Sequence, residues 1–316
     1  MPQATKSLIT REARPSQPRP LGRQRRRYRF EWTFFTLAIP ALIIYVGFLV
    51  GPTLAAFYFS LTRWDGINSP TFIGLGNFIQ LVNDDDFHAA LLHTFIFTAL
   101  ISIGQLASGL GLAILLNRAG RNVSVLRGIF FAPSLLSSAV IALLWGFIFN
   151  PLVGILAQLA NAVGLKGSWL ADVLGQRESA ILGISFVVVW QFAGYIMVIY
   201  VAGLKNIPEE VYEAASLDGA TGARRFWDIT WPLLAPSTSI VLTIAIAGNL
   251  RLFDQVYLLT GGGPAGGTET VGTLIYRTAF TNSNYGYSVT QSVVLTVLTA
   301  VAVVIQRWLS ARRNKT

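Results

Sequence analysis

The stretch that decides the fold runs from Lys205 to Pro236 and reads KNIPEEVYEAASLDGATGARRFWDITWPLLAP, between two long apolar segments. Asn206 and Glu209 have the spacing of a capping box, with Asn206 as the helix N-cap. Gly219 is placed to end this helix, because glycine readily adopts the left-handed conformation of helix C-termini. A second short helix is expected over about 221–230. The segment therefore predicts a well-capped helical hairpin outside the apolar part of the chain.

The composition around this hairpin is that of a membrane protein. The chain has 316 residues, of which 53% are hydrophobic and only 12% charged. Soluble domains carry about 25% charged residues, so two soluble domains of this total length would lack charge for their surfaces. There is no cysteine, which excludes disulfides and thiolate chemistry. A secreted disulfide-rich protein and a disordered chain are excluded as well.

Six apolar stretches are long enough to cross a bilayer, which takes about 20 residues in a helix. In lipid every backbone amide needs a partner within the protein, so we expect these stretches to be helices. A further segment, 152–165, has apolar residues at helical spacing and predicts a short helix on the membrane surface. The sequence thus predicts an all-α integral membrane protein with six transmembrane helices, at about 33–60, 90–117, 128–149, 179–204, 233–256 and 287–308.

Basic residues predict the orientation of these spans. With the N-terminus inside, nineteen of the 24 Lys and Arg residues fall on inside segments and four on outside loops. This distribution follows the positive-inside rule. We therefore expect both termini, and the 205–236 hairpin, in the cytoplasm.

Residues 1–30 form a separate basic arm that is expected to be disordered, before a membrane domain over 31–316. A basic tail can bind nucleic acid. Directly before a span, its expected role is to fix topology and contact anionic lipid.

The chain has no motif for binding ATP. A phosphate-binding loop needs a glycine-rich turn followed by Lys and Ser or Thr. None of the four lysines stands in that context, and the glycine-rich run at 261–267 lacks a lysine. Any ATP-driven activity therefore has to come from another chain.

Polar residues within or beside the spans are candidates for contact with a polar solute. They are Gln191 and Tyr195 in the fourth span, and Asn249 and Asp254 at the end of the fifth. The same side chains could instead form hydrogen bonds between helices. Arg251 lies three residues before Asp254, so the two could pair on one helix face.

The acidic run from Asp84 to Asp86 allows a different class of function, an intramembrane enzyme that uses magnesium. Such an enzyme needs a second acidic cluster, and no loop supplies one. We therefore expect this run to be a solvated turn before the second span.

The 205–236 segment resembles the permease subunits of binding-protein-dependent ABC importers. Their signature is Glu-Ala-Ala, three residues, Gly, nine residues and Ile-x-Leu-Pro. Trp231 stands where the family has Leu, an apolar change that leaves the pattern intact. The resemblance implies that the hairpin couples the chain to an ATPase, and the matching positions are Glu213, Ala214, Ala215, Asp218, Gly219, Ile229 and Pro232.

Other stretches resemble the carbohydrate-uptake branch of this family, the maltose and glycerol-phosphate permease type. These stretches are residues 64–66, 72–78, 253–264 and 270–280. The resemblance implies the type I importer fold and alternating access for a sugar or polyol. The same fold with another solute, such as an amino acid or polyamine, remains an alternative.

The resemblance also implies partners. They are a second homologous permease, two ATP-binding subunits and an extracytoplasmic solute-binding protein. ATP and magnesium belong to the ATP-binding subunits, and no cofactor, metal or nucleic acid is expected on this chain. The expected location is the cell membrane of a prokaryote.

Overall fold

The computed structural model describes residues 32–117, 120–165 and 167–313, so the basic arm at 1–30 lies outside the described residues. Two short strands, β1 and β2, pair antiparallel with Thr62 opposite Phe72, and all other regular elements are helical. The strands are β1 Thr62–Arg63 and β2 Thr71–Phe72. The α-helices are α1 Trp32–Tyr45, α2 Gly51–Phe59, α3 Gly76–Val82, α4 Asp85–Leu115, α5 Arg121–Phe131, α6 Ser138–Ile148, α7 Ile155–Ala162, α8 Arg177–Lys205, α9 Glu209–Leu217, α10 Gly222–Arg225, α11 Trp231–Leu233, α12 Ala235–Asn249, α13 Asp254–Thr260, α14 Val271–Tyr276 and α15 Tyr285–Arg313. Shorter 3-10 or π turns are η1 Val46–Val50, η2 Ala132–Leu135, η3 Phe226–Thr230 and η4 Arg277–Thr281.

The chain divides into two compact units, at 1–51 and 52–316. The described part of the first unit is a helix, formed by α1 and η1. This helix continues into α2, and together they supply the first candidate membrane span, Ala38–Phe59. The second unit holds the remaining helices.

Among the described residues, four helices are long and apolar enough to cross a membrane, and two bent helix pairs bring the number of spans to as many as six. The unbroken helices α4, α8 and α15 coincide with the predicted spans at 90–117, 179–204 and 287–308. The helical fold and the count of spans therefore agree with the prediction.

The span predicted over 128–149 is not one continuous helix. The segments Asn122–Leu135 and Ser138–Ile148 meet at an angle of 98°. Pro133 lacks a backbone N–H and lies in the 3-10 turn η2, after which Leu136 is extended. Ser137 then starts α6 as its N-cap, accepting a hydrogen bond from the Ala139 amide at 3.2 Å.

The predicted fifth span, 233–256, is also interrupted, because α12 ends at Asn249 and α13 begins only at Asp254. The Thr270 hydroxyl donates to the Leu252 carbonyl at 2.9 Å. This side chain replaces the amide that a continuing helix would have supplied. At its other end, α12 meets Gly222–Leu233 at a bend of 67°.

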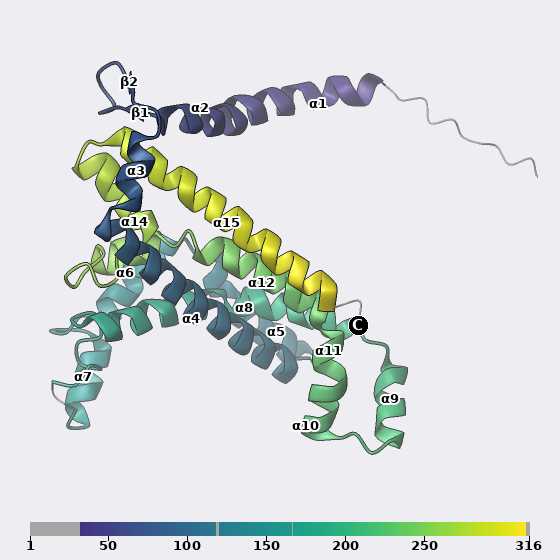
Figure 1. The fold of residues 1–316 in the computed structure, drawn as a ribbon. Coiled ribbons are helices and arrows are strands. Elements are labelled where there is room, and N and C mark those ends of the chain that lie inside the picture. The colour runs from purple at the N-terminus through teal and green to yellow at the C-terminus, as the bar shows by residue number, and fades with distance from the viewer. Residues whose placement is uncertain (1–31, 118–119, 166, 314–316) are drawn as a thin grey trace, which may run out of the picture. The chain divides into compact units, whose positions relative to one another are not determined.

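The centre of the second unit is the packing of α4 along α8, with α12 beside both and α15 against α12 (Figure 1). Two glycines of α4 allow the close approach. A Cβ at Gly104 would lie 2.6 Å from Val189 Cγ2, and a Cβ at Gly109 would overlap Ile196. Small residues at such positions are typical of helix contacts in membranes.

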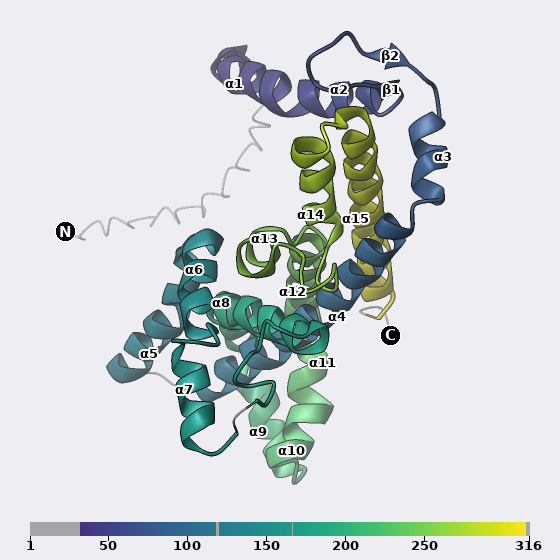
Figure 2. The ribbon, with the colours of Figure 1, turned by 90° about the vertical axis from the view of Figure 1, so that its left-hand side faces the viewer.

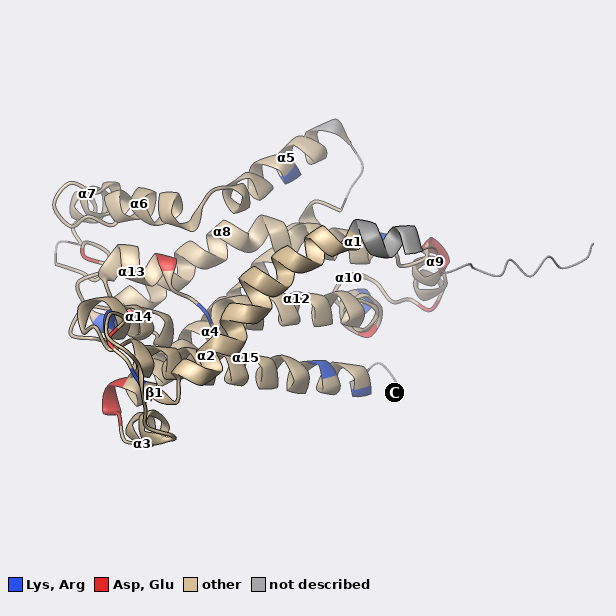
Figure 3. Cartoon of the chain, turned by 90° about the horizontal axis from the view of Figure 1, so that it is seen from above, with Lys and Arg blue, Asp and Glu red and all other residues tan. Residues whose placement is uncertain are grey.

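The hairpin of α9, α10, η3 and α11 stands out from one end of the second unit, which we call the hairpin end (Figure 1). Basic residues of α10 and of the last turns of α15 lie at this same end (Figure 3). The prediction that Asn206 caps the first hairpin helix is wrong: Asn206 ends α8, and Pro208 precedes α9. The opposite end, which we call the distal end, carries β1, β2, α3 and the 261–284 segment.

Candidate functional site

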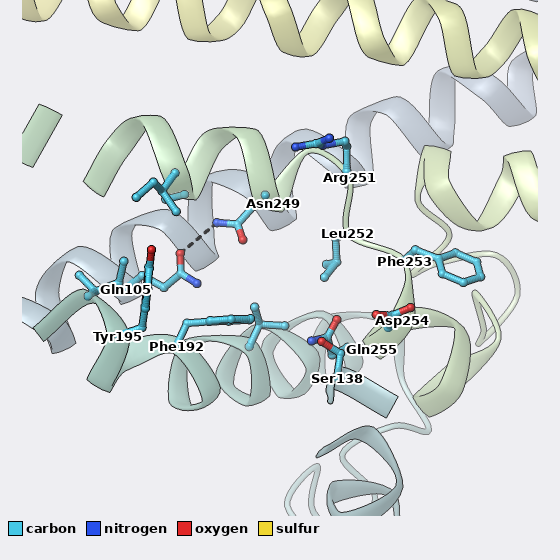
Figure 4. A pocket seen from close by; sticks show the side chains of 15 residues that line it. Gln105, Ser138, Phe192, Tyr195, Asn249, Arg251, Leu252, Phe253, Asp254 and Gln255 are labelled. Atoms are coloured by element: carbon cyan, nitrogen blue, oxygen red, sulfur yellow. Dashed lines mark hydrogen bonds between the residues drawn. The ribbon is translucent and has the colours of Figure 1, made fainter. Parts of the chain in front are cut away.

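A cavity of about 460 Å³ lies within the second unit, between α4, α8, α12 and α13 (Figure 4). Its wall is mostly apolar and carries a few polar groups, a combination typical of ligand sites. Seven of the fifteen lining residues lie at 248–255, in the break between α12 and α13 or directly beside it. The lining residues are Gln105, Ser138, Val188, Phe192, Tyr195, Ile196, Ile244, Ala245, Gly248, Asn249, Arg251, Leu252, Phe253, Asp254 and Gln255.

Asn249, the last residue of α12, anchors one side of the cavity. Its amide donates to Ser102 Oγ at 3.1 Å and to Gln105 Oε1 at 3.2 Å, both on α4 (Figure 4). All three side chains are buried. Asn249 therefore joins two helices and also faces the cavity, so the two roles considered from the sequence coincide in one residue.

Two linked hydrogen bonds lie on the other side of the cavity. Gln255 of α13 donates to Gln191 Oε1 at 3.0 Å, and Gln191 donates to the Leu136 carbonyl at 3.3 Å. Gln191 does not line the cavity. Its side chain is 1% exposed and orients Gln255, which does line it. Leu136 has an extended backbone and lies at the break between η2 and α6. Gln191 therefore also supplies a hydrogen-bond donor to a backbone carbonyl at a broken span.

Arg251 and Asp254 do not share a helix face, which corrects the expectation from their spacing. Arg251 lies in the turn after α12, where its Nε donates to the Ala247 carbonyl at 2.9 Å. Asp254 is the first residue of α13. Among the described residues no ion pair joins them, and both exposed side chains line the cavity (Figure 4).

Three of the four residues predicted for the solute pathway, Tyr195, Asn249 and Asp254, thus line one cavity. Sequence reasoning missed Gln105, Phe253 and Gln255. Gln105 had a signal, since a polar residue inside a predicted span is a candidate functional residue. The other two lie beyond the break in the fifth span, which the apolar pattern did not show.

The residues of the family signature all lie on the hairpin. Glu213, Ala214, Asp218 and Gly219 are exposed, and Ala215 is buried. Ile229 and Pro232 follow in η3 and α11, where Ile229 is half-buried and Pro232 exposed. The signature therefore presents an acidic and small-residue surface away from the bundle.

Contacts across the hairpin hold its two arms together. The Tyr212 hydroxyl lies 3.3 Å from Thr230 Oγ1, and the Arg225 guanidinium lies 5.5 Å from the centre of the Tyr212 ring. Within the second arm, Arg224 of α10 and Asp228 of η3 form an exposed ion pair at 3.5 Å. The hairpin is thus a folded unit with its own internal contacts.

Acidic side chains of the 84–86 run form hydrogen bonds and an ion pair with other parts of the protein. Asp84 is the N-cap of α4, accepting from the Phe87 amide at 3.1 Å, and also accepts the Tyr287 hydroxyl. Asp86 pairs with Arg277 at 3.1 Å. Two of its three carboxylates therefore hold α4, η4 and α15 together, so the run is more than a solvated turn.

A helical membrane bundle with broken spans, a largely apolar cavity that carries a few polar groups, and a projecting hairpin has the architecture of a transporter's membrane subunit. Residues 105–315 match the model of the family described as "Binding-protein-dependent transport system inner membrane component". The chain belongs to this family, and it is a permease subunit of a binding-protein-dependent ABC importer and not an enzyme.

Characterised relatives cover most of the chain. It is 34% identical over 278 residues to "Probable ABC transporter permease protein YurN" of Bacillus subtilis (strain 168), covering 86% of this chain and 94% of that protein. It is 33% identical to "Multiple sugar-binding transport system permease protein MsmF" of Streptococcus mutans, covering 89% and 95%. It is 36% identical to "sn-glycerol-3-phosphate transport system permease protein UgpA" of Agrobacterium fabrum, covering 84% and 89%.

A solved structure has the same fold. It is titled "Crystal structure of bacterial alginate ABC transporter in complex with alginate pentasaccharide-bound periplasmic protein". One of its chains matches 90% of this chain and 96% of its own length, with a TM-score of 0.79 and 22% identity. At this identity the match shows the fold alone, which is the predicted type I importer permease fold.

Proposed function

We propose that this chain forms one half of the translocation pathway of an ATP-driven carbohydrate importer. The relatives named for multiple sugars and for sn-glycerol 3-phosphate support a sugar or polyol as the solute. The cavity supports it too, because amides and a carboxylate set among apolar and aromatic groups suit a ligand with many hydroxyls. Tyr195, Asn249 and Asp254 are the proposed solute contacts, and Gln191 the residue that orients Gln255.

The hairpin at 205–236 is proposed to couple this chain to a separate ATPase. The observation that carries this is the exposure of the signature at the end of a projecting hairpin, where Leu217 is 88% exposed. Trp227, in the same segment, is 62% exposed, and two large exposed apolar side chains within the signature support a contact surface for a partner. ATP and magnesium would be bound by that partner.

The proposed complex contains a second homologous permease, two ATP-binding subunits and an extracytoplasmic solute-binding protein. The hairpin end is proposed to face the cytoplasm, together with both termini, in the cell membrane of a prokaryote. The basic residues of α10 and α15 at that end support this orientation through the positive-inside rule.

Differential contact would drive the transport cycle. A partner that changes state with ATP can shift this chain between its outward and inward states only if it contacts them differently. The hairpin is the proposed site of that contact, and the breaks beside the cavity are the elements proposed to respond.

The coupling role is tested with a charge reversal in the complete importer. Glu213→Lys is expected to reduce co-purification of the ATP-binding subunits and solute uptake together. Glu210→Lys is the matched control, since it makes the same change on an exposed residue of the same helix outside the signature. Wild-type stoichiometry and uptake in Glu213→Lys would contradict the coupling role.

The solute is tested by uptake into proteoliposomes that hold the importer and its solute-binding protein. The probes are partial hydrolysates of starch, pectin and alginate, with glycerol 3-phosphate and an amino-acid mixture as the alternatives. Uptake of saccharides or glycerol 3-phosphate is expected. Uptake of amino acids alone would refute a carbohydrate or polyol importer.

A further inference from the structure

The buried imidazole of His93, on α4, has only one protonation state that fits its hydrogen bonds. Its side chain is 4% exposed, with Nδ1 3.0 Å from the Glu269 carbonyl and Nε2 2.8 Å from Nη2 of Arg177. A carbonyl oxygen only accepts, so Nδ1 carries the ring proton. A guanidinium only donates, so Nε2 must keep its lone pair. His93 is therefore held as the neutral imidazole.

A second proton, on Nε2, would turn the contact with Arg177 into a repulsion. Two N–H groups would face each other at 2.8 Å, and two positive charges would lie side by side. The Glu269 carboxylate is already paired with Arg277 of η4 at 3.0 Å, and Arg277 also pairs with Asp86 of α4 at 3.1 Å. Within the described part of the chain no carboxylate pairs with His93 itself, so no ion pair offsets the repulsion.

His93 contacts a segment that leads directly to the cavity. This segment, residues 261–270, joins α13 to α14, and we call it the connecting segment. Glu269 is its contact with His93, and the next residue, Thr270, donates to the Leu252 carbonyl at 2.9 Å. Leu252 is part of the cavity wall. The position of Glu269 against His93 therefore sets the position of the hydrogen bond at the break between α12 and α13.

Two neighbours of His93 hold the connecting segment at the same place. Thr94, the next residue of α4, accepts from the Val271 amide at 3.0 Å. Arg177 packs against Gly267, where a Cβ would lie 2.7 Å from Arg177 Cγ. α13 packs on α8 and α14 on α4, so the connecting segment runs across these two central helices (Figure 2). Arg177 is exposed at the start of α8, so water at the distal end borders the pair that it forms with His93.

We propose that His93 is a positioning residue for transport, and that its protonation from the distal side releases the connecting segment and slows uptake. The neutral ring holds the segment through which Thr270 bonds the cavity wall. The protonated ring loses Arg177, and with it the attachment of the segment to α8. This inference rests on the proposed function and orientation, and it specifies how external pH regulates the same cavity.

The first test follows the connecting segment and needs no solute. Thr268→Cys places a thiol on a residue of this segment that is 0% exposed, and Ile67→Cys places one on a residue at the distal end that is 91% exposed. Each variant is reacted with a maleimide in the purified importer, and labelling of this chain is measured by gel shift. The ratio of the two labelling rates corrects for the effect of pH on thiol reactivity.

The ratio of the Thr268→Cys rate to the Ile67→Cys rate is expected to rise roughly tenfold or more between about pH 7.5 and about pH 5, the equivalent of losing one hydrogen bond to a charged group. With His93→Gln added the ratio is expected to stay constant, because an amide donates and accepts without changing charge. The matched control is His88→Gln, the same substitution at the only other histidine of the chain, which is exposed. It is expected to keep the wild-type response.

Uptake is the second test, and it decides the proposal even if Thr268→Cys does not fold. Proteoliposomes hold the complete importer with its solute-binding protein outside, and only the external buffer is acidified. The probes are the starch hydrolysate and glycerol 3-phosphate. The uptake rate of the wild type relative to His93→Gln is expected to fall with external pH, since the partner chains are the same in both. Glu269→Gln is expected to fall as the wild type does, which separates His93 from the neighbouring carboxylate.

Two results would overturn the role of His93. One is a labelling ratio, or a relative uptake rate, that does not change with pH. The other is a pH response that is as large in His93→Gln as in the wild type. Uptake of no saccharide or polyol at neutral pH would instead refute the proposed solute class, and the labelling ratio would still decide the role of His93.

Discussion

Gly219 shows how a single residue shapes the hairpin. Its φ of +76° lies in the left-handed region, and the Ala220 amide just beyond it donates to the Ala215 carbonyl at 2.9 Å. This bond closes the C-terminus of α9. A side chain at Gly219 would meet no atom within 4 Å, so any cost of substitution comes from the backbone.

Gly219→Val is therefore expected to distort the turn, because a left-handed conformation costs an ordinary L-residue about 1–2 kcal/mol. The expected result is reduced binding of the ATP-binding subunits and reduced uptake, with normal insertion in the membrane. Gly219→Asn is the control, since Asn tolerates this conformation. Co-purification and uptake assays give the answer, and normal values in Gly219→Val would contradict the role of the turn.

Asn249 is the residue on which the cavity wall depends, since its amide reaches both Ser102 and Gln105. Asn249→Leu removes these hydrogen bonds between α12 and α4. The free energy of unfolding in detergent is expected to fall by about 0.6–1.7 kcal/mol, the range for such bonds between membrane helices. The exposed Asn83, which bonds only the Ile79 carbonyl of its own helix, is the comparison.

Asn83→Leu is expected to change the free energy of unfolding by less than about 0.5 kcal/mol. Thermal or denaturant unfolding of both variants measures the difference. Equal effects of the two substitutions would show that the Asn249 contacts add no stability.

At the scale of elements, ion pairs and hydrogen bonds tie the helix ends toward the distal end. Arg277 in η4 pairs with Glu269 at 3.0 Å and with Asp86 of α4 at 3.1 Å. His93 of α4 contacts the Glu269 carbonyl at 3.0 Å and Arg177 of α8 at 2.8 Å. Through these contacts the segment before α14 is held against the two central helices.

Burial raises the pKa of Glu269 above its usual value of 4.5, although Arg277 lowers it and Asp86 raises it further. Arg277 also pairs with Asp86, so its positive charge does not fully offset the effect of burial on the pKa of Glu269. The folded protein therefore keeps a proton that the unfolded chain loses above pH 4.5. The resulting stabilisation is complete below that pH and is lost as pH rises through the raised pKa.

The prediction concerns wild type and Glu269→Gln, in which residue 269 cannot ionise. The unfolding temperature of the wild type relative to the variant is expected to fall as the pH rises from about 4 to 8. Unfolding temperatures of both proteins across this range measure it. A difference that stays constant, or that rises with pH, would contradict the raised pKa.

At the scale of the whole molecule, the orientation of the two ends is open to a direct test. The chain has no cysteine, so one introduced cysteine is the only labelling site. Ile67 at the distal end is 91% exposed, and Leu217 on the hairpin is 88% exposed. Ile67→Cys and Leu217→Cys therefore place the label at opposite ends of the second unit, on side chains of nearly equal exposure.

In cells that make this chain without the ATP-binding subunits, which would cover Leu217, a membrane-impermeant maleimide is expected to label Ile67→Cys in intact cells and Leu217→Cys only after permeabilisation. The reason is the basic hairpin end, which the positive-inside rule places in the cytoplasm. Gel-shift detection of the labelled protein reads the result. Labelling of Leu217→Cys in intact cells would reverse the proposed orientation.

The apolar pattern was enough to find the spans but not their interruptions. The helix predicted over 128–149 is broken because Pro133 and Ser137 act on the local backbone within an unbroken apolar stretch. At the break after α12, the Leu252 carbonyl accepts its hydrogen bond from Thr270, which is far along the chain. Sequence periodicity carries no information about such a distant partner.

The sequence by itself determined the membrane class, the apolar segments, the lack of an ATP-binding loop and the signature on the 205–236 hairpin. These properties depend on composition and on spacing within short segments, which set hydrophobic transfer and helix capping. The cavity at the break between α12 and α13, and the packing of the segment after α2 against the start of α15, emerge only from the three-dimensional fold. Both bring together residues from separate helices, and the packing that brings them together is fixed by contacts between segments, such as Gly286 against Thr62, that no local pattern encodes.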